Sequence, residues 1–169
     1  MFPSSVRIAL ALVLFILGTF LASFGRIEGL FLIIGALYWL FTYVRYGPIK
    51  VAFVAYRRGQ LDKAKELIAG VRWPRLLAGR LRPYYHWVRG GIAAHDGDLE
   101  TARDEYTTAL ALRPRVESDR SVLSALLAEL AVMRGDRPAA REHLAAARGL
   151  DHREDLDPFL EDLERRAAG

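Results

Sequence analysis

The sequence predicts an all-α protein, in which a two-helix transmembrane hairpin precedes a short α-solenoid of three helical hairpins and a C-terminal capping helix. Three observations lead to this prediction. Two long apolar runs lie near the N-terminus, a glycine-centred pattern recurs every 38 residues, and apolar residues follow helical spacing from residue 48 onward. The predicted boundaries are residues 1–47 for the hairpin, 48–150 for the repeats and 151–169 for the capping helix.

The hairpin is predicted from residues 6–24 and 30–46, two apolar runs about as long as a bilayer-spanning helix. The GRIEG segment between them predicts a tight polar turn. An aromatic cluster near the end of the second run is typical of a membrane interface, and consists of Tyr38, Trp39, Tyr43 and Tyr46. One alternative is a cleaved secretory signal beginning near Arg7, although no convincing cleavage site follows it. Two buried helices of a soluble protein are the other alternative.

The distribution of basic residues predicts the orientation of the hairpin. Its turn carries only Arg26 and Glu28, whereas the stretch from the end of the second run onward is basic and contains Arg45, Lys50, Arg57 and Arg58. The positive-inside rule then places both termini in the cytoplasm, in a two-span protein of a bacterial-type inner (plasma) membrane. Residues 50–89 carry a net charge of +8 and residues 90–169 a net charge of −6, so the basic part adjoins the expected membrane.

The repeats are centred on three glycines, Gly59, Gly97 and Gly135. Alanine follows each glycine by five residues, and a larger apolar residue follows it by nine, namely Ile68, Tyr106 and Leu144. Each glycine is expected just past the end of one helix, because glycine tolerates the left-handed conformation common there. Asp98 and Asp136 are good N-caps for the next helix, and Gln60 is a poorer one.

Small residues complete the pattern. They stand seven residues before each glycine (Ala52, Gly90, Ala128) and four before it (Ala55, Ala93, Ala131). With these positions the chain resembles the tetratricopeptide repeat family, most closely in the repeat around Gly97. The period of 38 residues departs from the 34 typical of that family, and generic helical hairpins remain the alternative. After the repeats, Asp157 and Pro158 can open an amphipathic helix with Leu156, Phe159, Leu160 and Leu163 on one face, suited to cap a solenoid.

No catalytic motif stands out. The four histidines have no metal-ligand spacing, the chain has no cysteine, and phosphate-binding loops, dinucleotide fingerprints and nucleophile elbows are absent. The sequence therefore predicts a protein that is not an enzyme and has no metal or cofactor.

Residues 70–89 alternate arginines with aromatic residues. Beside a membrane hairpin, this pattern predicts contact with anionic lipid headgroups, through Arg72, Trp73, Arg75, Arg80 and Arg82. Packing between repeats and single-stranded nucleic-acid binding are the alternatives, and nucleic acid is not expected because no fold signature for it is present.

The family resemblance implies a partner-binding groove along the first helix of each repeat. Carried over by position, the groove residues are Phe53, Tyr56, Arg57, Tyr84, Trp87, His95, Glu129, Val132 and Met133. An apolar helix or loop of another protein, in particular of an integral membrane protein, suits this aromatic and apolar set. The predicted function is a membrane-anchored scaffold or adaptor that mediates complex assembly. The alternative is a permanent accessory subunit of a large respiratory or photosynthetic membrane complex.

Overall fold

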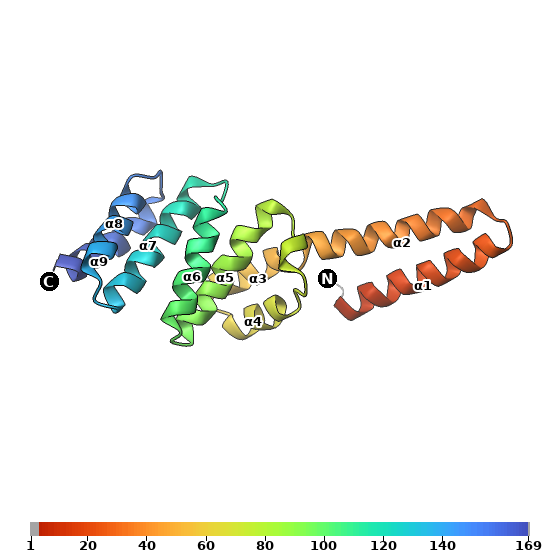
Figure 1. Ribbon diagram of the computed structural model, residues 1–169, viewed down its shortest axis with the longest axis horizontal. Coiled ribbons are helices and arrows are strands. Elements are labelled where there is room, and N and C mark those ends of the chain that lie inside the picture. Colours follow the sequence, from red (N-terminus) through yellow and green to blue (C-terminus); the bar gives the residue numbers. More distant parts are fainter. Residues whose placement is uncertain (1–3, 169) are drawn as a thin grey trace. The chain divides into compact units, whose positions relative to one another are not determined.

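The computed structural model describes residues 4–168, without the side chains of residues 4–8, 43 and 44, so the predictions for Arg7 and Tyr43 lie outside the described residues. Across residues 4–168 the chain forms nine α-helices and three short 3₁₀-helices, with no strand (Figure 1). The chain divides into two compact units, Met1–Gly47 and Pro48–Gly169. The all-α prediction is confirmed.

The first unit is a hairpin of α1 (Ser4–Ser23) and α2 (Ile27–Tyr46), joined by a turn in which Gly25 has a φ of +72°. Small residues line the contact between the two helices, because Ala11, Gly18, Gly29 and Ala36 are buried. Within the part of the chain that is described, no helix has both the length and the apolar character needed to cross a membrane. The helical hairpin is therefore present, but its transmembrane character is not supported by the fold.

The second unit contains three successive helical hairpins (Figure 1). They are α3 (Ile49–Arg57) with α4 (Leu61–Ala69), α5 (Arg82–His95) with α6 (Leu99–Ala111), and α7 (Glu117–Met133) with α8 (Arg137–Arg148). Two 3₁₀-helices, η1 (Pro74–Leu76) and η2 (Gly79–Leu81), lie between α4 and α5. A third, η3 (Glu154–Leu156), leads into α9 (Asp157–Ala168).

The three turns between paired helices share one geometry. Gly59, Gly97 and Gly135 have φ angles of +73°, +83° and +74°. After each glycine, the next backbone N–H donates to the carbonyl of the alanine four residues before the glycine, at 2.9 Å in all three turns. Only a residue that accepts a positive φ closes a helix in this way, which is why glycine recurs there. The predicted turn glycines are confirmed.

The N-caps also follow the prediction. The Asp98 carboxylate accepts a hydrogen bond from the Thr101 backbone N–H at 3.0 Å, and Asp136 accepts one from Ala139 at 3.1 Å. Gln60 makes no side-chain cap hydrogen bond. The hydrogen bond from Thr101 keeps the pKa of Asp98 below its ordinary value.

The buried apolar residues of the described chain form successive clusters along the hairpins, and α9 closes the last of them. Leu160, Leu163 and Ala167 of α9 are buried against α7 and α8, with Leu156 and Phe159 partly buried beside them. At the other end, Leu77, Ala78 and Leu81 from the segment between α4 and α5 are buried in the core of the first hairpin. This segment is therefore packed rather than a loose linker.

Candidate functional site

Aromatic residues predicted for the groove pack against one another at the contact between α3 and α5. The ring centroids of Phe53 lie 4.9 Å from Tyr84 and 5.0 Å from Trp87, both in edge-to-face geometry. Trp87 is only 5% exposed, and Phe53 and Tyr84 are half-buried. Most of this aromatic surface is thus used to join the first two hairpins, which leaves a shorter free groove than the sequence implies.

Tyr84 also links α5 to the third hairpin. Its hydroxyl donates to Asp119 Oδ2 of α7 at 2.6 Å. Burial, and then the hydrogen bond and negative charge of Asp119, raise the pKa of Tyr84. The phenol therefore remains a neutral donor over the physiological pH range, and this bond ties the second hairpin to the third.

Tyr56 of α3 packs against Gly91 of α5, while Tyr106 of α6 packs against the neighbouring Gly90. A methyl group added at Gly91 would lie 2.3 Å from the end of the Tyr56 ring. The Tyr106 hydroxyl donates to the Tyr56 oxygen, and burial raises the pKa of both phenols. Tyr56 is thus an interhelical packing residue as well as a predicted groove residue.

Arg57 and Trp87 line a cavity of about 320 Å³ that also includes residues of α7 and of the segment around η3. Arg153 and Asp155 of that segment form an ion pair at 3.2 Å. The Trp87 indole Nε1 is buried, and no residue in the described part of the chain accepts a hydrogen bond from it. The predicted groove at this point is therefore bordered by charged side chains of both signs.

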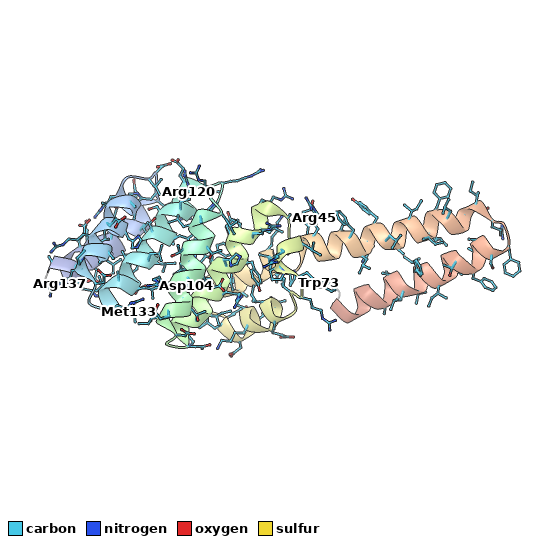
Figure 2. The ribbon with its side chains drawn as sticks, viewed as in Figure 1. Arg45, Trp73, Asp104, Arg120, Met133 and Arg137 are labelled. Atoms are coloured by element: carbon cyan, nitrogen blue, oxygen red, sulfur yellow. The ribbon has the colours of Figure 1, made fainter. Side chains whose placement is uncertain are left out.

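The remaining predicted groove residues are spread over α5 and α7. His95 is exposed at the C-terminal end of α5, and Met133 is exposed at the end of α7, where Figure 2 labels it. Val132 is half-buried against the core formed with α8 and α9. Burial raises the pKa of the half-buried Glu129, and the charge of Arg166 partly opposes that shift. Partner binding through these positions stays a prediction.

The arginine-rich segment before α5 borders a cleft of about 650 Å³, here called the arginine cleft. One wall is the segment of residues 72–76, which contains η1; Figure 2 labels Trp73 on it. The second wall is one face of α5, and the third is the C-terminal end of α6 with Leu112. Four arginines border the cleft: Arg72, Arg75, Arg82 and Arg89.

Two of these arginines are fixed by other groups. The Arg82 guanidinium donates to the carbonyl oxygens of Leu77, at 3.3 Å, and of Arg75. Arg89 forms an ion pair with Glu105 Oε1 at 3.1 Å, and Glu105 Oε2 lies 2.7 Å from His86 Nδ1. For Arg72 and Arg75, no carboxylate partner is found among the described residues.

Of the five predicted membrane-contact residues, Arg72, Trp73, Arg75 and Arg82 line the cleft, whereas Arg80 does not. Sequence reasoning missed Arg89 and His86. Both could have been found from helical spacing, because residues 82, 86 and 89 recur at steps of four and three and so share one face of α5. Leu112 could not have been found from the sequence, because its position beside residues 72–76 depends on how α6 packs on α5.

No group of three or more metal-ligating side chains is found among the residues that the structure describes. The His86–Glu105 pair and the pairing of His152 with Asp157 at 3.1 Å each consist of one histidine and one carboxylate. Among the described residues, no hydrogen bond or ion pair joins either pair to a nucleophilic side chain.

Comparison with known proteins adds one result. Residues 122–146 match the family described as Tetratricopeptide repeat. This stretch covers most of α7, the Gly135 turn and most of α8, so the match falls on the third hairpin and not on the one around Gly97. Neither the search of curated proteins nor the search of solved structures finds a match. The chain is thus similar to tetratricopeptide repeat proteins, a family typical of protein–protein interaction scaffolds.

Proposed function

We propose that the chain is a membrane-anchored scaffold that holds partner proteins at the cytoplasmic face of a bacterial-type inner membrane. The repeat unit binds protein, and the α1–α2 hairpin anchors it. The observation that carries the proposal is the arrangement of side chains on this hairpin, where small residues lie inside and large apolar residues lie outside.

The inner side of the hairpin allows the two backbones to approach closely. A methyl group added at Gly29 would lie 2.5 Å from the Gly18 carbonyl oxygen and 2.5 Å from the Ala22 nitrogen. Helices that associate in lipid commonly use small residues in this way, because no hydrophobic effect drives them together and close packing is needed.

The outer side of the hairpin consists of large apolar residues. Ile16 is 64% exposed, Phe20 60% and Phe31 69%. Figure 2 shows side chains extending outward along both helices. A water-soluble hairpin would bury such residues at its interface, because each Å² of buried apolar surface contributes about 25 cal/mol. Lipid, or the apolar helices of another protein, would remove these side chains from water. The proposal goes beyond the fold, in which no described helix qualifies as a membrane span.

The match to the tetratricopeptide family supports scaffolding over catalysis. Exposed residues at the ends of the first helices, Arg57, His95 and Met133, remain available to a partner. The predicted groove residues that pack internally act indirectly, by setting the spacing of α3, α5 and α7. No catalytic step is proposed.

The second candidate is a permanent accessory subunit of a large respiratory or photosynthetic membrane complex. It is favoured by the short free groove, because Phe53, Tyr84 and Trp87 are used in internal packing. In that case the outer faces of α1 and α2 pack on the helices of neighbouring subunits, whereas in the scaffold they face lipid.

Purification of the full chain in a mild detergent separates the two candidates. For the scaffold, we expect partners that vary between preparations and are lost in a high-salt wash, because exposed charged contacts are screened by salt. A constant one-to-one ratio with a large complex that survives the wash would instead establish the accessory subunit.

Cysteine labelling tests the topology, and the chain contains no native cysteine. Ile27→Cys lies at the start of α2 and Thr101→Cys lies in α6. With both termini in the cytoplasm, a membrane-impermeant reagent applied outside intact cells labels position 27 and not position 101. Labelling at position 101 alone would mean that the orientation is inverted, and equal labelling of both in sealed cells would rule out membrane insertion.

A further inference from the structure

We propose that the arginine cleft binds the phosphate-bearing headgroup of an anionic phospholipid, with the upper part of the lipid chains lying against its apolar residues. This inference rests on the proposed placement of the protein at a membrane. The sequence pattern predicts only a general attraction of these arginines to anionic headgroups, whereas the cleft provides one defined binding site.

Uncompensated positive charge is the first argument. Arg72 and Arg75 border the cleft and have no carboxylate partner among the described residues, whereas other arginines of the repeat unit form ion pairs, such as Arg134 with Glu100 at 2.7 Å. No carboxylate is among the described residues that line the cleft, and Glu105, which contacts two of the lining side chains, is shared between His86 and Arg89. The cleft therefore keeps a net positive charge that an anion can neutralise.

Pre-organisation is the second argument. The Arg82 side chain is tied to the carbonyl groups of residues 75 and 77, so it loses little conformational freedom when it binds a ligand. Arg89 is held by Glu105, and its guanidinium also lies 5.8 Å from the centroid of the Tyr85 ring. Guanidinium groups suit phosphate because two of their N–H groups can donate in parallel to two oxygens.

The electrostatics of α5 act in the same direction. Arg82 and Tyr85 of its first turn border the cleft, and no side chain caps this helix N-terminus. The first turn of a helix carries partial positive charge from its unpaired N–H groups. The C-terminal end of α6 opposes this effect near Leu112, but the guanidinium groups of Arg72, Arg75 and Arg82, which form no ion pair among the described residues, outweigh the partial charge of one helix end.

Exposed apolar side chains decide the class of ligand. Trp73 and Leu76 are each 56% exposed, and both border the same cleft as the arginines. A soluble phosphate compound without hydrocarbon would leave these apolar side chains exposed to water. A phospholipid presents phosphate and hydrocarbon side by side, and tryptophan is favoured at the boundary between them. The cleft volume of about 650 Å³ lies within the range of about 300–1,000 Å³ usual for small-molecule sites.

The test uses the full chain in a non-ionic detergent, titrated with dioctanoyl phosphatidylglycerol, dioctanoyl phosphatidylcholine or glycerol phosphate, with bound lipid counted by native mass spectrometry. We expect saturable binding of one phosphatidylglycerol and weaker binding of the other two. The double variant Arg72→Gln and Arg75→Gln should lose about tenfold or more in affinity, since each arginine near an anionic lipid contributes several-fold. The matched control is Arg58→Gln with Lys63→Gln, two exposed positions outside the cleft.

Trp73→Ala distinguishes lipid from phosphate. This variant should weaken phosphatidylglycerol binding and leave glycerol phosphate binding unchanged. Glycerol phosphate binding as tight as the lipid would make the cleft a site for soluble phosphates. Tighter binding of a short single-stranded oligonucleotide would assign it to nucleic acid, and equal losses in the cleft and control variants would show that no defined site exists. Each of these three results would overturn the proposal.

Failure of the membrane anchor would be seen separately, by washing membranes with alkaline carbonate. A chain that is released by the wash but still selects phosphatidylglycerol in detergent lacks the anchor and keeps the cleft. A chain that resists the wash but does not distinguish the lipids keeps the anchor and lacks the cleft.

Discussion

Gly29→Val should separate the two helices of the N-terminal hairpin. The first carbon of the new side chain would lie 2.5 Å from two backbone atoms of α1, the Gly18 oxygen and the Ala22 nitrogen. Backbone of a helix cannot shift locally as a side chain can, so the helices must move apart and lose their close packing. Overpacking of this kind costs about 1–3 kcal/mol, and occasionally more.

Cross-linking measures this effect. Ala11→Cys and Ala36→Cys place thiols on α1 and α2 at positions that line one cavity between the helices, and the chain has no other cysteine. A short bifunctional thiol reagent should join them in the parent and should join them much less in Gly29→Val. Gly35→Val is the matched control in α2, because a carbon added at Gly35 meets nothing within 4 Å. Equal yields for both valine variants would mean that the described hairpin contact is wrong.

Gly90→Val should destabilise the repeat unit by about 3 kcal/mol, at the upper end of the usual cost of overpacking. The new carbon would lie 2.5 Å from Cδ1 of Tyr106 and 3.2 Å from the Ala102 carbonyl oxygen. Tyr106 is only 2% exposed, and a side chain in a close-packed interior cannot move aside without disturbing its neighbours. Thermal or urea unfolding of the full chain in detergent, followed by circular dichroism, measures the loss. Gly79→Val, where an added carbon meets nothing within 4 Å, is the control.

The other two hairpins suggest how to recover this stability. Where the middle hairpin pairs Gly90 with Tyr106, the first has Ala52 with Ile68 and the third has Ala128 with Leu144. Glycine on the first helix is thus paired with the bulky tyrosine on the second helix, whereas alanine on the first helix is paired with the smaller isoleucine or leucine. Gly90→Ala combined with Tyr106→Leu should therefore be more stable than Gly90→Ala alone. If the second substitution only adds to the loss, the two positions do not compensate and the size argument fails.

The sequence alone predicted much of the fold, because many of its signals are local. Glycine at a positive φ and aspartate at an N-cap act within a few residues, so the turns at Gly97 and Gly135 could be placed without knowledge of the rest of the chain. The apolar face of α9 was likewise visible from the spacing of Phe159, Leu160 and Leu163.

The candidate sites were predicted less completely, because burial depends on neighbours that are distant in sequence. Phe53, Tyr84 and Trp87 are assigned to a binding groove only by their positions in the family's repeat pattern. In the structure, these rings instead pack against one another where α3 meets α5. The sequence predicts one lipid-contacting stretch between α4 and α5, whereas the structure buries Leu77 and Leu81 of this segment and leaves Trp73 exposed.

By itself, then, the sequence determined that this protein is helical, where its repeats turn and where its positive charge is concentrated, since these properties follow from the conformational preferences and ionisation of single residues. Only the tertiary structure decided which side chains remain available. Packing α6 on α5 brings Leu112 to the arginines of residues 72–75, and close approach of α1 and α2 at Gly18 and Gly29 turns their large apolar residues outward. The physical reason is that close packing fills each contact according to the shapes of both partners, and neither partner's shape can be read from the other's sequence.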